Sequence, residues 1–207
     1  MLETIYSSNK FLNQNEMAVN AKYILDYLIN EGWTKNAICA LLGNAQIEST
    51  LNPGIWESLR QGNLAGGYGL LQWTPATKYM DWCKQHHLDP SSMSAALKRV
   101  LWEVRNNEQW VNPLMTFEQF THSTLKPEEL ANLFLQHYER PLNRNQPDRA
   151  KLARYWFNNL ENPAVNDSQQ WVKHTGISYG DRPNDPATRE EVWSMMHNLY
   201  KVMKNGG

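Results

Sequence analysis

Apolar residues recur at helical spacing along most of this 207-residue chain, and one glycine-rich stretch interrupts the pattern. The spacing predicts helices over residues 15–31, about 34–52, 74–86, 91–107, 127–139 and 147–160. Thr34 is expected to cap the second of these helices, and Thr74 the third, with Pro75 at its first position. Between residues 53 and 73 the helical period is lost and five glycines occur, which favours a hairpin or a short strand. The pattern therefore predicts a mainly helical α+β fold with one small β lobe.

A polar, proline- and asparagine-rich segment at residues 161–168 divides the chain into two predicted parts. Residues 1–163 are long enough to bury a core of their own. Residues 164–207 are expected to form a short helical appendage, with one helix over 168–174 and another from Ala187 to about Met203, capped by Asp185. Two short helices cannot bury a core alone. The appendage is thus expected to dock on the main domain, to pair with another copy, or to stay mobile.

Composition excludes several classes of protein. Twenty Lys and Arg balance 21 Asp and Glu, so no global attraction to nucleic acid or to an anionic membrane is expected. No run of about 18 apolar residues predicts membrane insertion, and the first 17 residues lack the basic start and apolar core of a signal peptide. Cys39 and Cys83 are expected to be buried, reduced thiols. No Cys/His cluster has zinc-binding spacing, so neither a metal nor another cofactor is expected.

The charged residue that stands out is Glu48, in the string GNAQIEST. Ile38, Leu41, Ala45 and Glu48 are separated by three, four and three residues, which places the carboxyl on the apolar face of its helix. The last turn of a helix is the negative end of its dipole. Both features disfavour the ionised carboxylate. A carboxyl group that keeps its proton near neutrality is what a glycosidase needs as a general acid. A Glu that only binds loop backbone, or that points to solvent at a frayed helix end, would fit the same pattern.

The segment that follows offers polar groups beside glycines. Strand alternation in GYGLLQW would send Tyr68, Leu70 and Gln72 to one face, and Leu71 and Trp73 to the other. One face would then present a phenol and an amide, which suit sugar hydroxyls and N-acetyl groups. The chain is also rich in Trp and Tyr, with nine of each against five Phe, and such rings hold sugars well. An ordinary small hairpin remains the alternative.

A helix that ends in Glu-Ser, a glycine-rich region and then Gly-Tyr-Gly-Leu-Leu-Gln-Trp resemble the goose-type lysozyme and lytic transglycosylase superfamily. More specifically, residues 10–160 resemble the phage tail lysozyme family, through the strings GWTKNAICALLGNAQIESTLNPGIWES, GGYGLLQWTPATKYMDW, LKRVLWEV and YERP. The resemblance implies a lysozyme-like fold with a cleft between a helical lobe and the β lobe. It implies Glu48 as the catalytic acid, acting on the β-1,4 bond between N-acetylmuramic acid and N-acetylglucosamine in bacterial peptidoglycan.

The resemblance also implies substrate-binding residues. Tyr68 and Gln72 correspond to residues that contact sugar, and Trp73 is counted with them. Tyr138 corresponds to a tyrosine near the catalytic glutamate, with a helix-packing tyrosine as the alternative. The second carboxylate is open, because Glu57 is the one acidic residue between Glu48 and Asp81. Glu57 would be the base that activates water, or Glu48 would act alone and the C6 hydroxyl of muramic acid would form a 1,6-anhydro product.

The C-terminal string WVKHTGISYGDRPNDPATREEVWSMMHNLY resembles an SLH-type segment, which implies wall docking or self-association. Three readings of the whole chain remain open. It is a peptidoglycan glycosidase, an inactive wall-binding virion module, or a wall amidase or peptidase, and the last lacks a zinc ligand set and a recognisable cysteine nucleophile. The glycosidase reading places the protein at the bacterial cell wall, either as a component of the phage tail or after release from the host cytoplasm at lysis.

Overall fold

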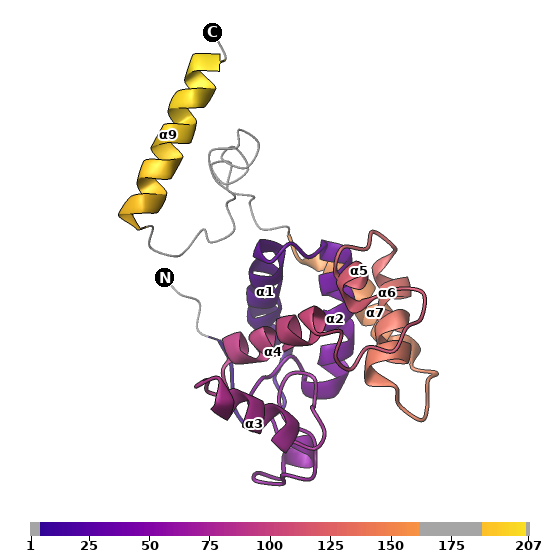
Figure 1. Ribbon diagram of the computed structural model, residues 1–207. Helices are drawn as coiled ribbons and strands as arrows, with labels where there is room; N and C mark the ends of the chain where they lie inside the picture. Colours follow the sequence, from indigo (N-terminus) through magenta and orange to yellow (C-terminus); the bar gives the residue numbers. More distant parts are fainter. Residues whose placement is uncertain (1–4, 162–187, 206–207) are drawn as a thin grey trace. The chain divides into compact units, whose positions relative to one another are not determined.

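The computed structural model describes residues 5–161 and 188–205. The chain divides into two compact units, Met1–Glu161 and Asn162–Gly207. The described part of the first unit is mainly helical, as the sequence predicts (Figure 1). None of the helices described is long and apolar enough to cross a membrane.

The first two helices confirm the sequence expectation closely. Helix α1 spans Gln14–Asn30 and begins at Asn13, whose side chain accepts hydrogen bonds from two backbone N–H groups of the first turn. Helix α2 spans Lys35–Ser49, and Thr34 caps it by accepting a bond from the N–H of Ala37. It ends at Thr50, whose left-handed backbone (φ 53°) turns the chain out of the helix. Glu48 therefore lies in the last turn of α2.

The hairpin expected in the glycine-rich segment is not formed as a pair of strands. Within residues 5–161 the backbone pairing there consists of two isolated bridges, Trp56 with Tyr68 and Tyr68 with Trp73. A short 3-10 helix, η1 (Glu57–Leu59), follows the first bridge partner. The predicted alternation is wrong, because Leu70 and Leu71 are both buried in a tight turn. A β lobe in the sense of a sheet is absent from the described residues.

Three helices follow the glycine-rich segment. Helix α3 spans Thr77–Gln85, and its N-cap is Ala76 rather than the predicted Thr74, whose hydroxyl donates to the carbonyl of Gln72 instead. Helix α4 spans Met93–Arg105 and is capped by Ser92. The short helix α5, Phe117–Thr121, was not predicted, because five residues are too few to display a helical period.

The last helices of the first unit pack on α2. Helix α6 spans Pro127–Phe134 and continues without a break into a π-helical turn, η2 (Leu135–Glu139). Helix α7 spans Pro147–Asn159 and starts with proline in its first turn. Helix α2 contacts both α6 and α7, which also contact each other. Helix α7 also reaches the end of α2 that bears Glu48, through Arg149.

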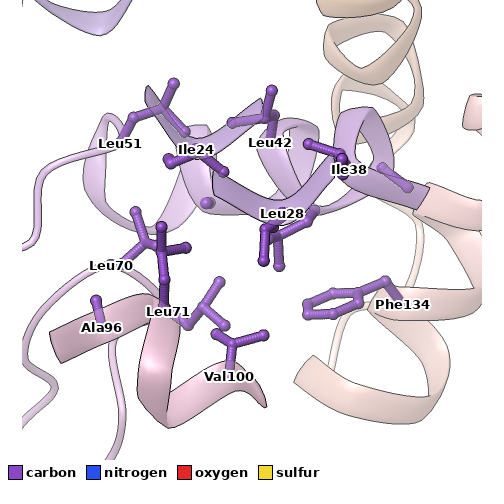
Figure 2. Close-up of a cluster of buried hydrophobic side chains, with 14 of the residues drawn as sticks. Ile24, Leu28, Ile38, Leu42, Leu51, Leu70, Leu71, Ala96, Val100 and Phe134 are labelled. Atoms are coloured by element: carbon purple, nitrogen blue, oxygen red, sulfur yellow. The ribbon is translucent and has the colours of Figure 1, made fainter. Parts of the chain in front are cut away.

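A single apolar core joins the helices of the first unit. Figure 2 shows Ile24 and Leu28 of α1, Ile38 and Leu42 of α2, and Val100 of α4 grouped together with Leu70 and Leu71 of the glycine-rich segment. The two cysteines are free and buried, as expected, and burial raises the pKa of Cys39 to about 12. The glycine-rich segment is thus fastened by its leucines, although it has no sheet.

In the second unit, the structure describes helix α9, Arg189–Asn205. Thr188 and Glu191 form reciprocal side-chain bonds at its start. The predicted cap Asp185 and the predicted helix over 168–174 lie outside the described residues. Helix α9 carries large exposed apolar side chains: Val192, Trp193, Met196, Tyr200 and Met203.

Candidate active site

Glu48 is held in place by an arginine that is distant in sequence. Arg149, on α7, donates from Nη2 to Oε1 of Glu48 over 2.5 Å. The arginine side chain is 5% exposed, whereas that of Glu48 is 21% exposed, so the carboxyl lies at the boundary between the interior and solvent. The apolar face predicted for Glu48 is therefore only part of its surroundings.

Arg149 is itself fixed by three further hydrogen bonds. Its Nη1 donates to both the carbonyl and the side-chain oxygen of Asn44, and its Nε donates to Gln146. Asn44 is fully buried and uses its amide nitrogen on the carbonyls of Ala40 and Ala131. A buried guanidinium with this many acceptors has little freedom to turn. The network therefore sets the position of the Glu48 carboxyl.

Gly43 allows this network to form, because α2 and α7 approach closely there. A Cβ atom at position 43 would lie 2.4 Å from the carbonyl oxygen of Arg149 and 2.7 Å from the nitrogen of Ala153. Both of those atoms belong to the backbone and cannot move aside cheaply. A side chain at position 43 would therefore push α7, and Arg149 with it, away from Glu48.

A second carboxyl group lies in the same electrostatic environment. Glu139 ends η2, and its Oε1 is buried without a hydrogen-bond partner. Burial raises the pKa of Glu139 well above the usual range of glutamate; the negative charges of Glu48 and Glu103 raise it further, and Arg149 opposes them. Glu139 is therefore protonated at a pH at which an ordinary glutamate is ionised.

Ser49 attaches the glycine-rich segment to the end of α2. Its hydroxyl is buried and donates to the carbonyls of Ala45 and Leu70. Leu70 lies between two of the predicted sugar-contacting residues, so the segment that carries them is fastened one residue after Glu48. Gln72 has a left-handed backbone (φ 46°), and its amide nitrogen donates to the carbonyls of Ile55 and Gly69. This leaves the amide oxygen of Gln72 as the group that can accept a bond from a ligand.

The tyrosine and tryptophan candidates lie deeper than expected. Tyr68 is 5% exposed and packs against Trp56, with ring centroids 4.7 Å apart. Trp73 and Tyr138 are 4% and 2% exposed. Trp73 Nε1 donates to Glu103 and to the Tyr138 hydroxyl, which in turn donates to Glu103 over 2.5 Å. The polar atoms of Trp73 and Tyr138 are thus occupied inside the protein, which weighs against direct contact between these two residues and sugar.

Glu57 is exposed and supports the loop around it. Its Oε2 accepts a bond from the N–H of Gly67 over 2.9 Å, and its own N–H donates to the carbonyl of Gly67. Gly66 also lies against this carboxyl, since a Cβ there would come within 2.6 Å of Oε2. Within residues 5–161 no hydrogen bond joins Glu57 to Glu48. The role of Glu57 as a water-activating base remains a prediction.

Comparison with known proteins shows the family to which this chain belongs. A family model described as "Phage tail lysozyme" matches residues 19–160. The chain belongs to the phage tail lysozyme family. It is also 58% identical over 156 residues to a protein named "Morphogenesis protein 1" of Bacillus phage B103. The match covers 75% of this chain but 43% of that relative, so the chain corresponds to less than half of the relative's length. Residues 161–207 lie outside the family match, and their likeness to an SLH segment remains a prediction.

In this member of the phage tail lysozyme family, four residues of the candidate site were not singled out in the sequence: Asn44, Glu103, Glu139 and Arg149. Two of them had a signal of the kind that identified Glu48. Arg149 precedes the buried Ala153 and Trp156 by four and seven residues, and is thus a charged residue on an apolar helix face. Glu103 likewise lies three residues after Val100 on the buried face of α4. Glu139 falls within the string YERP, but the spacing of apolar residues around it does not indicate a site residue.

No group of three or more His, Cys, Asp or Glu side chains in residues 5–161 and 188–205 could hold a metal ion. An open depression of about 350 Å³ lies at α3 and α4, where Trp82, Arg99 and Trp102 contribute to its lining. None of the six predicted site residues lines that depression. The cleft implied beside Glu48 therefore remains a prediction.

Proposed function

We propose that this protein cleaves the glycan strands of bacterial peptidoglycan at the β-1,4 bond between N-acetylmuramic acid and N-acetylglucosamine. The proposal draws on the phage tail lysozyme family match. The observation that supports it most directly is the position of Glu48, which lies at the end of α2, bonded to Arg149. Ser49 fastens the loop with Tyr68 and Gln72 at the same point. A carboxyl group is thereby held next to a glycine-rich segment that a polar ligand can approach closely.

In the proposed reaction Glu48 acts as the general acid. Its proton passes to the glycosidic oxygen as the bond from that oxygen to C1 of muramic acid breaks, and positive charge develops on the sugar ring. Addition of water then gives a reducing end, which is the muramidase outcome. The reaction requires that the Glu48 carboxyl, which lies within a hydrogen bond of Arg149, carry a proton when the glycosidic bond breaks.

A lytic transglycosylase is the second candidate. In that reaction the C6 hydroxyl of muramic acid attacks C1 and no water-activating base is needed. The engagement of Glu57 with Gly67 favours this candidate, since the carboxylate that would serve as a base already supports its own loop. Inverting glycosidases place their two carboxyl groups roughly 6.5–9.5 Å apart, with water between them.

The place of action is proposed from the relatives. The family is described as phage tail lysozyme, and one relative is named for morphogenesis. Both names support the proposal that this protein is a component of the virion and acts on the bacterial wall. Release at host lysis is the alternative. Wall docking or self-association through residues 164–207 is proposed on the sequence alone.

Mass spectrometry of muropeptides tests the function. Purified peptidoglycan is digested with the protein and with its Glu48→Gln variant, and the soluble products are compared. Products with a reducing N-acetylmuramic acid end would support the muramidase, and 1,6-anhydro ends the transglycosylase. Products cleaved within the peptide or at its amide link would contradict both. Wall binding without any soluble product would identify an inactive binding module.

A further inference from the structure

The open depression at α3 and α4 combines two tryptophan rings with polar side chains. Trp82 and Trp102 both line it, and their ring centroids lie 6.2 Å apart. Its volume of about 350 Å³ falls within the roughly 300–1,000 Å³ of small-ligand sites. Because the depression is open, a ligand that is bound there can continue beyond it, as one unit of a polymer does.

The two rings are held in position by Arg99. The guanidinium carbon of Arg99 lies 4.4 Å from the ring centroid of Trp102 and 5.4 Å from that of Trp82, a favourable cation–π arrangement. Arg99 is buried, and its Nε donates to Glu103 over 2.8 Å. The aromatic surface is therefore fixed before a ligand arrives, which reduces the loss of side-chain entropy on binding.

The indole N–H of Trp82 is a buried donor, and within the described residues it has no acceptor. By contrast, the Nε1 atoms of Trp73, Trp110 and Trp156 each donate to an oxygen of the protein. Buried polar groups nearly always have a partner, because leaving them unpaired costs free energy. Trp82 lines the depression, so an oxygen of a ligand seated there is a source of the missing acceptor.

The charges around the depression offset one another. Lys78 and Asp81 are exposed lining residues of opposite sign, and Arg99 is paired with Glu103. The lining is therefore not a cluster of cations suited to a phosphate, and the guanidinium over both rings repels a cationic ligand. Gln85, which is also exposed, adds an amide that both donates and accepts. This combination favours a neutral ligand with an apolar face and several hydroxyl groups.

We propose that this depression binds one N-acetylated sugar unit of a glycan strand, at a place separate from the bond that is cleaved. The C–H face of a sugar ring packs on the indole rings, while Asp81 and Gln85 bind its hydroxyl and amide groups. The choice of a glycan rests on the proposed function, in which the protein acts on that polymer. None of the six predicted site residues lines the depression, so it is a second binding site. A strand held at both places leaves the protein more slowly than a strand held at one.

Proton–nitrogen correlation NMR of the full-length protein tests this binding directly, because each tryptophan gives one indole N–H signal. The Glu48→Gln variant is titrated with the β-1,4-linked trisaccharide of N-acetylglucosamine at millimolar concentration. Trp82→Phe and Trp102→Phe assign the two signals of the depression, and both signals are expected to shift. If both stay unchanged, the proposal is overturned. Shifts caused by inorganic phosphate but not by the trisaccharide would identify an anion site and would also overturn it.

A double variant, Asp81→Ala with Gln85→Ala, tests the polar part of the site. Both side chains are exposed on α3, so the fold should be kept, and the thermal midpoint checks this. The loss of two hydrogen-bonding groups should raise the Kd read from the Trp102 signal at least about fivefold. Lys84→Ala is the matched control, because it removes an exposed side chain of α3 that does not line the depression. An equal Kd in the double variant and the control would contradict the assigned contacts.

Binding and cleavage are measured separately, so the two proposals fail separately. Muropeptide products from the unmodified protein, together with unshifted signals of Trp82 and Trp102, would exclude the second site alone. Shifted signals without any muropeptide products would leave the depression as a glycan-binding site and contradict the proposed cleavage. Chromatography of the recovered trisaccharide shows whether Glu48→Gln still cleaves it, an outcome that would contradict the role of Glu48 and not the second site.

Discussion

Arg149 donates a 2.5 Å hydrogen bond to Glu48 across 101 residues of sequence, and so α7 determines where the proposed catalytic acid lies. The close approach of the two helices at Gly43 makes that contact possible. The proposed acid therefore depends on α7, a helix that lies far beyond the glycine-rich segment in the sequence. This relationship explains why a carboxyl on an apolar helix face can stay partly exposed and still be held in one position.

Glu48→Gln is expected to keep the fold and to lose nearly all wall-clearing activity. The amide is nearly the same size and can still accept a bond from Arg149, but it cannot donate the required proton. General-acid catalysis typically contributes about 10²–10⁴-fold. Turbidity loss of a bacterial wall suspension measures the effect, and the denaturant midpoint checks the fold. Retention of more than about a tenth of the rate would exclude Glu48 as the general acid.

Tyr138→Phe is expected to affect stability more than substrate binding. The hydroxyl lost in this variant donates to Glu103 and accepts from Trp73, both buried. Trp73 keeps its bond to Glu103 Oε1, but Glu103 Oε2 loses its donor, and such a loss costs about 1–3 kcal/mol. Urea unfolding measures the cost, and the KM for soluble glycan fragments is expected to stay unchanged. A raised KM with unchanged stability would instead assign Tyr138 to sugar contact.

Much of the fold follows from the sequence, because apolar spacing is a local property. It predicts α1, α2, α4 and α7 with ends that differ from the observed ones by a few residues, and it places Glu48 correctly in the last turn of α2. The strand alternation expected for Tyr68 to Trp73 fails, because the tight turn buries consecutive leucines and a six-residue segment cannot reveal this in advance.

The partners of Glu48 were harder to predict than its own position. The bond from Arg149 depends on how α7 packs against α2, which is set by tertiary contacts rather than by a local period. The same pattern, a charged residue on an apolar helix face, occurs at Glu48, Glu103 and Arg149. Glu139 has no such signal, since it is the last residue of the short π-helical turn η2, where no helical period can be recognised.

Glu57→Gln distinguishes the two proposed reactions. If the protein hydrolyses its substrate by inversion, loss of the base should lower the rate by about 10²–10⁴-fold. If Glu57 only supports its loop, glutamine can still accept the bond from Gly67 through its amide oxygen, and the rate should stay near normal. Initial rates on purified peptidoglycan measure the difference. A near-normal rate together with reducing-end products would require another way to position water.

Truncation after Pro163 is expected to leave glycan cleavage intact and to weaken association with the intact wall. All proposed site residues lie in the first compact unit, Met1–Glu161, and the family match ends at residue 160. Helix α9, by contrast, exposes Trp193, Met196 and Tyr200, which are apolar groups suited to contact with another surface.

Three measurements on the truncated and full-length proteins test this expectation: cleavage of soluble glycan fragments, co-sedimentation with intact walls, and the thermal midpoint. Unchanged cleavage with weaker sedimentation supports an appendage that docks on the wall. Trp193→Ser in the full-length chain is the matched variant, because it reduces the apolar surface of α9 without removing the unit. Loss of soluble-fragment cleavage in a truncated protein that remains folded would mean that residues 164–207 complete the active site, and the proposed division of the chain would be wrong.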